Sequence, residues 1–241
     1  MTTYPHTLMP RRPQLGLVVL QSDETVEGDL RRLLPSEADV LDTRVPSGEE
    51  VTPETLAAME GALGAAAALL PRGARLGAIG YACTSGTAQI GAARVAAILR
   101  AASGAPAATD PLSALVDACR RRGLRRLALL SPYVAPVTAS LRAALAREGL
   151  ETPVFGSFEI AEEARVALID GPSIVAAAEA LAAEGGVDAL FLSCTNLRTL
   201  EVIATIETRT ELPVLSSNLV LAEHLARLAH LGSVGIPDAQ P

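Results

Sequence analysis

Short aliphatic runs alternate with alanine-rich stretches along most of the chain, and this alternation constrains the fold more than any other feature. Residues 15–20 form the first run, and residues 53–70 form the first long helical stretch. Such alternation is typical of βαβ units, in which helices cover a parallel sheet. Further strands are expected at residues 40–45, 76–83, 126–131, 153–158, 187–193 and 214–216, and further helices at residues 87–102, 112–122, 135–148, 172–183, 197–208 and 219–230. Aromatic residues make up only 2% of the chain, so the core must consist of Ala, Leu, Val and Ile, which suits helices packed on parallel strands.

One local design occurs twice. Residues 77–87 and residues 188–199 are both apolar strands that deliver Cys-Thr into a polar turn before an expected helix. Two matching halves predict two lobes related by pseudo-twofold symmetry. We expect an N-terminal lobe of residues 14–108 plus 217–241, a C-terminal lobe of residues 109–216, and a loose tail at residues 1–13.

Cys83 and Cys194 occupy the matching positions of these two turns. Ligands of parallel sheets gather at the carboxyl ends of strands, and a helix N-terminus lowers the pKa of a thiol. Opposed thiols could move protons on two faces of one carbon, or one could add to a double bond while the other protonates the neighbouring carbon. A single cysteine at a strand end is more often a small buried hydrophobe, but the repetition favours function. Cys119 lies within an expected helix and is assigned to packing.

Polar side chains follow both cysteines. Hydroxyls and backbone N–H groups of this kind can hold a carboxylate. Simple helix capping is the alternative, but capping alone does not require both turns to begin with Cys. The residues concerned are Thr84, Ser85, Gly86 and Thr87 in the first turn, and Thr195, Asn196 and Thr199 in the second. Arg198 could clamp a carboxylate or face solvent.

Charge and spacing exclude several classes of protein. A net charge of -7 without a basic stripe argues against nucleic acid. Three irregularly spaced cysteines make no disulfide framework, which favours a reducing, cytoplasmic location. Residues 1–13 lack the continuous apolar core of a signal peptide or membrane span. The three histidines form no metal-ligand set, and no dinucleotide fingerprint follows the first strand, so we expect a small ligand and no metal or cofactor.

Four motifs are spread along the chain: residues 16–27, residues 81–87 (Tyr-Ala-Cys-Thr-Ser-Gly-Thr), residues 131–133 (Ser-Pro-Tyr) and residues 192–199 (Leu-Ser-Cys-Thr-Asn-Leu-Arg-Thr). They resemble those of maleate cis-trans isomerases and arylmalonate decarboxylases, within the aspartate/glutamate racemase superfamily, and the resemblance spans nearly the whole chain. The chain looks closest to racemase-like proteins encoded with ectoine-utilisation genes. The resemblance implies two Rossmann-like (flavodoxin-like) lobes with parallel four-stranded sheets, a site between them, no cofactor, and a homodimer.

The same resemblance implies roles for individual residues. Cys83 would be the nucleophile and Cys194 the proton donor, whereas arylmalonate decarboxylases have a glycine at the position of Cys83. Tyr133 would join Thr84 and Ser85 in the pocket that holds a carboxylate.

Two carboxylates depart from the maleate isomerase pattern, because Asp23 and Glu163 stand where those enzymes have asparagine. Each would repel a dianion by about 1–4 kcal/mol at ~4 Å and would attract an ammonium group. Alternatively, Asp23 caps a turn or helix, and Glu163 begins a solvated helix. We therefore expect a racemase or isomerase of a small, nitrogen-bearing carboxylic acid that Thr195 and Asn196 also contact. Maleate isomerisation, arylmalonate-type decarboxylation and non-catalytic metabolite binding remain the alternatives.

Overall fold

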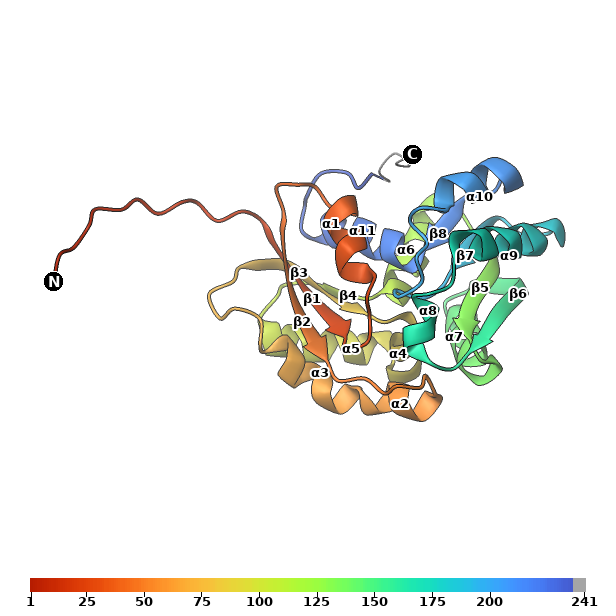
Figure 1. Cartoon of the computed structure of the whole chain (residues 1–241), viewed down its shortest axis with the longest axis horizontal. Coiled ribbons are helices and arrows are strands. Elements are labelled where there is room, and N and C mark those ends of the chain that lie inside the picture. The colour runs from red at the N-terminus through yellow and green to blue at the C-terminus, as the bar shows by residue number, and fades with distance from the viewer. Residues whose placement is uncertain (236–241) are drawn as a thin grey trace.

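Two four-stranded sheets, each entirely parallel, form the centre of the molecule (Figure 1). The computed structural model describes residues 1–235. The first sheet has the order β2-β1-β3-β4 and the second the order β6-β5-β7-β8, so both lobes repeat one topology. The strands are β1 (Gln14–Leu20), β2 (Asp39–Val45), β3 (Leu76–Ala82), β4 (Ala108–Thr109), β5 (Arg126–Tyr133), β6 (Glu151–Ile160), β7 (Ala189–Leu192) and β8 (Val214–Ser216). The predicted fold class is confirmed.

Helices cover both sheets. They are α1 (Val26–Leu33), α2 (Pro53–Ala58), α3 (Glu60–Ala67), α4 (Thr84–Ile90), α5 (Ala92–Ser103), α6 (Pro111–Arg122), α7 (Ala135–Arg147), α8 (Glu163–Val166), α9 (Gly171–Ala183), α10 (Ile203–Thr210) and α11 (Ser217–Leu228). Helices α3 and α5 pack together against the first sheet, and α9 packs with α10 against the second. Figure 1 shows α1 and α11 on the side of the first sheet opposite α3.

Helix α11 links the two lobes. It follows β8 of the second sheet but packs against β3 of the first, so its first turn lies where the lobes meet. The lobe boundaries stay a prediction, and residues 236–241 of the predicted N-terminal lobe lie outside the described residues. Residues 1–13 are exposed and contain no helix or strand. Among residues 1–235, no helix has both the length and the apolar composition needed to cross a membrane.

Three predicted helices have different bounds. The stretch at residues 53–70 is interrupted at Met59, and a break at Gly91 separates α4 from α5 because a φ of 99° is incompatible with a helix. The helix expected at residues 197–208 begins only at residue 203. The apolar spacing of residues 197–202 suggested a helix, but Leu197 and Leu200 belong to a non-helical loop and point into the core. Elements α1, α8 and β4 were not predicted.

Gly16 of strand β1 leaves no room for a side chain. A Cβ atom there would lie 2.9 Å from Leu76, 3.0 Å from Leu70 and 3.1 Å from Ile79, whereas at Gly28 of α1 it would meet nothing within 4 Å. We expect Gly16→Ala to lower the free energy of unfolding by about 1–3 kcal/mol through overpacking. The matched Gly28→Ala variant should raise it by about 0.5–1 kcal/mol by removing glycine from a helix. Denaturant unfolding measures both values, and equal stabilities would contradict this packing.

Candidate active site

Cys83 lies directly after β3 and is the N-cap residue of α4. Its Sγ accepts a hydrogen bond from the backbone N–H of Gly86 at 3.1 Å. The residue is only 6% exposed. Burial raises the pKa of this thiol to about 12, although the Gly86 N–H favours the thiolate. The thiol is therefore protonated unless a ligand or a neighbouring group changes its surroundings.

Cys194 follows β7 and has the unusual φ of 117° for a non-glycine residue. Its Sγ accepts the backbone N–H of Asn196 at 3.3 Å, which matches the contact made by the other thiol. It is 4% exposed, and burial raises its pKa well above the ordinary value, with the charge of Glu163 adding to the shift.

Two predictions about these cysteines are wrong. Cys194 does not precede a helix, because the next helix is α10 at Ile203. Neither thiol has a lowered pKa, since desolvation outweighs the N–H donor at both positions. The assignment of Cys119 to packing is confirmed, because it is fully buried in the hydrophobic cluster around α6.

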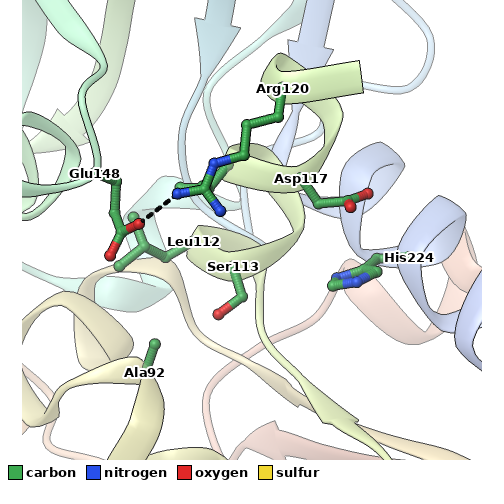
Figure 2. A pocket seen from close by; sticks show the side chains of 8 residues that line it. Ala92, Leu112, Ser113, Asp117, Arg120, Glu148 and His224 are labelled. Atoms are coloured by element: carbon green, nitrogen blue, oxygen red, sulfur yellow. Dashed lines mark hydrogen bonds and ion pairs between the residues drawn. The ribbon is translucent and has the colours of Figure 1, made fainter. Parts of the chain in front are cut away.

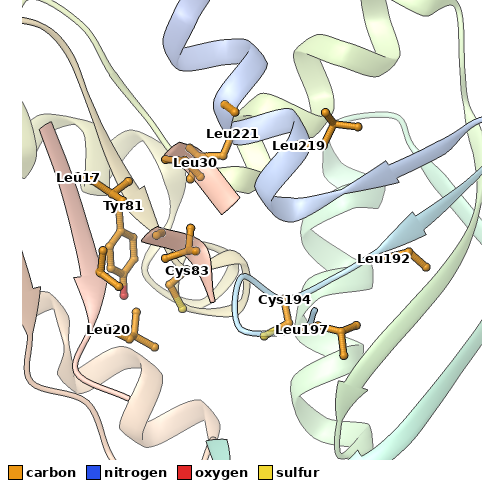
Figure 3. Packing of buried hydrophobic residues seen from close by; sticks show 14 of the residues in the cluster. Leu17, Leu20, Leu30, Tyr81, Cys83, Leu192, Cys194, Leu197, Leu219 and Leu221 are labelled. Atoms are coloured by element: carbon orange, nitrogen blue, oxygen red, sulfur yellow. The ribbon is translucent and has the colours of Figure 1, made fainter. Parts of the chain in front are cut away.

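The two cysteine loops are joined by one hydroxyl group. Ser217 Oγ accepts the backbone N–H of Cys194 at 3.0 Å and lies 2.8 Å from the hydroxyl of Thr84. Thr195 Oγ1 adds a hydrogen bond to the carbonyl of Ala82 at 3.1 Å. Figure 3 shows Cys83 and Cys194 on neighbouring loops that come from different sheets. The carboxyl groups of Glu163 and Asp23 raise the pKa of both thiols, which is consistent with a shared environment.

Tyr133 and Glu163 form a chain of hydrogen bonds that reaches Cys194. The Tyr133 hydroxyl lies 2.7 Å from Glu163 Oε2 and 2.9 Å from Cys194 Sγ, and Glu163 Oε1 lies 4.0 Å from the same sulfur. Tyr133 comes from the end of β5 and Glu163 from the start of α8. Glu163 is only 2% exposed, so it does not begin a solvated helix. Burial raises the pKa of Glu163 to about 7, and Asp23 contributes to the rise.

Asp23 caps helix α1. Its Oδ1 accepts the backbone N–H groups of Thr25 at 2.8 Å and Val26 at 2.9 Å, so the capping interpretation is confirmed. Its Oδ2 is buried without a hydrogen-bond partner, and burial raises the pKa of the carboxyl group. One carboxyl oxygen is therefore structural, while the other is an unused acceptor.

Asn196 ties three loops together. Its Oδ1 accepts the N–H of Glu24 at 2.9 Å, and its Nδ2 donates to the carbonyl of Glu163 at 3.2 Å. The hydroxyl of Thr25 also contacts Oδ1, at 3.3 Å. Its predicted contact with substrate stays a prediction, and the side chain already uses most of its hydrogen-bonding capacity. Arg198 is exposed and donates to the carbonyl of Ala167, away from the thiols.

Ser217, Asn218 and Asp29 were not predicted from the sequence as parts of the site. Asn218 Nδ2 donates to Asp29 Oδ2 at 2.8 Å and to the carbonyl of Thr195 at 2.9 Å, which fixes the second cysteine loop on α1. All three residues are buried. The polar run Ser-Ser-Asn at residues 216–218 was the available signal. It stands at the end of β8, just as a Cys-Thr pair stands after β3 and after β7.

Two backbone segments meet beside Glu163. Val51 donates to the carbonyl of Ala161 at 2.8 Å, and Glu163 donates from its backbone to the carbonyl of Glu49 at 3.1 Å. The cavity that Glu163 lines here has a volume of about 10 Å³, enough for one water molecule. Access of a carboxylic acid by this route requires the two segments to separate.

A larger cavity lies elsewhere between helices (Figure 2). Its volume is about 300 Å³, and none of the predicted site residues lines it. The lining residues are Ala92, Leu112, Ser113, Val116, Asp117, Arg120, Glu148 and His224. His224 Nδ1 lies 2.7 Å from the hydroxyl of Thr109, which gives this histidine a structural partner. Within residues 1–235, no cluster of three or more His, Cys, Asp or Glu side chains could hold a metal ion.

Comparisons with known proteins find relatives over most of the chain. The model of the arylmalonate decarboxylase family matches residues 47–236. A maleate isomerase of Nocardia farcinica is 31% identical over 238 residues, covering 94% of this chain and 93% of the relative. An arylmalonate decarboxylase of Bordetella bronchiseptica is 31% identical over 230 residues, covering 93% and 94%. The structure of a cysteine-to-serine mutant of the Nocardia farcinica maleate cis-trans isomerase, with a covalently bound succinylcysteine intermediate, superimposes with a TM-score of 0.77 at 29% identity, covering 91% of this chain and 93% of that one.

Removing the hydroxyl of Ser217 should weaken the junction of the two loops. In Ser217→Ala the backbone N–H of Cys194 loses its partner inside the core, which should lower the free energy of unfolding by about 1–3 kcal/mol. Ser140→Ala, at a half-buried position of α7 where the hydroxyl contacts an exposed carbonyl, is the control and should change stability by less than about 0.5 kcal/mol. Denaturant titration measures the difference, and two equally stable variants would contradict the structural role of Ser217.

Glu163 should make stability depend on pH. Its pKa rises from 4.5 to about 7 on folding, so the folded chain binds more protons between these values and loses stability as pH rises through them. Glu163→Gln removes this penalty without losing volume. We expect the variant to match the unsubstituted protein at pH ~4 and to exceed its free energy of unfolding by up to about 3 kcal/mol at pH ~8. Exposed Glu162→Gln should show no such pH-dependent difference, and a constant difference for Glu163→Gln would contradict a raised pKa.

Proposed function

The chain belongs to the arylmalonate decarboxylase family, and we propose that it is an isomerase that interconverts the cis and trans forms of a small unsaturated dicarboxylic acid. The supporting observation is that two loops, each carrying a buried cysteine and each following a strand of a different sheet, are joined by hydrogen bonds through Ser217 and Thr84. The mutant of the Nocardia farcinica maleate isomerase holds a succinylcysteine intermediate, in which a cysteine is covalently bonded to a four-carbon acid. Decarboxylation is less well supported, because the first-lobe cysteine is present here.

The reaction follows from the two sulfur atoms. Cys83 first loses its thiol proton to water as the substrate enters, and the Gly86 N–H stabilises the resulting thiolate. The thiolate supplies the electron pair of a new C–S bond at one alkene carbon, and the former π pair takes the proton of Cys194 at the neighbouring carbon. The central bond is then single and rotates. Removal of the proton and breaking of the C–S bond restore the double bond in the other geometry. Thr84 and Ser85 hold a carboxylate during the cycle, because the Tyr133 hydroxyl is already hydrogen-bonded to Glu163 and Cys194.

The carboxyl groups of Asp23 and Glu163 do not prohibit a dianion. Both have raised pKa values, and that of Glu163 is about 7, so a bound dianion can be accompanied by a proton on this side chain. A protonated carboxyl group donates a hydrogen bond to a substrate carboxylate instead of repelling it. The electrostatic objection to maleate is therefore weaker than the sequence alone indicates.

Racemisation of a nitrogen-bearing acid is the second candidate. The buried Oδ2 of Asp23 has no partner, and a substrate ammonium group would satisfy it. The same two thiols would then exchange the proton at Cα from opposite faces. Exchange of this proton for deuterium, without any change of a double bond, distinguishes this candidate.

Loss of either site thiol should abolish turnover. We expect Cys83→Ala and Cys194→Ala each to slow the conversion of maleate to fumarate, followed by proton NMR, by at least about 100-fold. Cys119→Ala is the matched control, because that thiol is buried around α6 and should leave the rate within a few-fold.

Specific results would overturn the proposal. Turnover that survives in the double variant Cys83→Ala/Cys194→Ala would refute cysteine catalysis. Release of carbon dioxide from a substituted malonate would instead identify a decarboxylase. Protection of a thiol by maleate without any reaction of maleate or of amino acids would identify a non-catalytic binding module.

A further inference from the structure

We infer that Glu163 is the acid that reloads Cys194 with a proton, through the hydroxyl group of Tyr133. The inference rests on the proposed function in one respect: that Cys194 gives its proton to a substrate carbon. The three groups form a continuous chain, with 2.7 Å between Glu163 Oε2 and the Tyr133 oxygen and 2.9 Å between that oxygen and Cys194 Sγ. Both distances are short enough for direct proton transfer.

The hydrogen bonds that link Glu163, Tyr133 and Cys194 can run in either of two directions. When Glu163 is a carboxylate, Tyr133 donates to it and Cys194 donates to the Tyr133 oxygen. When Glu163 is protonated, it donates to Tyr133, and Tyr133 donates to the sulfur. Only the second arrangement can return a proton to a Cys194 thiolate.

In this second arrangement every proton and the negative charge are accounted for. As the S–H bond of Cys194 breaks and a C–H bond forms on the substrate, the Tyr133 proton moves to the sulfur and the Glu163 proton moves to the Tyr133 oxygen. Cys194 and Tyr133 end neutral, and the negative charge remains on the Glu163 carboxylate. The reverse reaction returns each proton along the same path.

The proton moves from Glu163 towards Cys194 because Glu163 has a lower pKa than Tyr133 and Cys194. Burial raises the pKa values of Cys194 and Tyr133 well above their ordinary values, so neither can keep a negative charge at low cost. Glu163 has a pKa of about 7, close to the value that suits a general acid at neutral pH. Charge left on Glu163 therefore costs less than charge left on the sulfur.

The surroundings of Glu163 maintain this pKa. Burial raises the pKa of Glu163 and the charge of Asp23 adds to the rise, whereas hydrogen bonds from the side chains of Tyr133 and Asn196 lower it. Glu50 lines the same small cavity. Within residues 1–235 no arginine or histidine forms an ion pair with Glu163. On its own segment, Arg165 pairs with exposed Glu162 instead, at 3.7 Å.

A titration of the full chain labelled with ¹³C at cysteine Cβ tests the relay without substrate. The sequence contains three cysteines, so three signals are expected. The Cys194 signal should shift as pH passes through about 7, because Glu163 reverses the hydrogen bonds of Tyr133, whereas the Cys119 signal should not. Glu163→Gln should remove this step, Glu163→Asp should restore a titration step, and Glu162→Gln should leave it unchanged.

Kinetics on the same variants provides the second readout. The rate with maleate should fall as pH rises through about 7, since the protonated form of Glu163 is the active one. Glu163→Gln should lower the rate by about 100-fold or more and abolish this limb of the pH profile. Glu162→Gln should change neither.

The two readouts separate the possible failures. A Cys194 signal that ignores pH near 7, or that titrates unchanged in Glu163→Gln, overturns the relay even if the protein isomerises maleate. A titration step that depends on Glu163, in a protein that does not turn over maleate, supports the relay and refutes the proposed function.

Discussion

The contact between two cysteine loops through one buried serine is the interaction on which the site depends. Ser217 is the first residue of α11, which follows the second sheet and packs on the first. Its hydroxyl contacts Thr84 at 2.8 Å and the backbone N–H of Cys194 at 3.0 Å. Without this helix, the loops that follow β3 in the first sheet and β7 in the second would lack the hydrogen bonds through Ser217 that join them. The crossing helix makes them one site.

Burial sets the chemistry of this site. Both thiols are nearly inaccessible, and desolvation outweighs the single N–H donor that each sulfur accepts. The site therefore favours neutral groups, and a negative charge must be placed where it costs least. Glu163, next to Tyr133 and with a pKa of about 7, is the group that accepts charge most readily among these residues. In the proposed reaction, a buried carboxyl group can in this way serve a site for carboxylate substrates.

The sequence was sufficient to predict much of the fold and the two thiols. The alternation of aliphatic and alanine-rich stretches predicted seven of the strands, and the repeated Cys-Thr motif identified both positions that the structure joins. Sequence could not predict the sign of the thiol pKa shifts, because the helix dipole is visible in a pattern and desolvation is not. Nor could it distinguish Asp23, which caps α1, from Glu163, which contacts Tyr133. Ser217 and Asn218 were missed because they follow the short strand β8 and contribute only through the path of α11. The link to ectoine utilisation stays a prediction.

A crystal structure of the Cys194→Ser variant after exposure to maleate tests the central claim most directly. The proposed site predicts a four-carbon acid bonded to Cys83 Sγ, with the substituted residue 194 beside the neighbouring carbon and one carboxylate close to Thr84 and Ser85. An acid bound only in the cavity beside His224, or bonded to neither loop, would contradict the account.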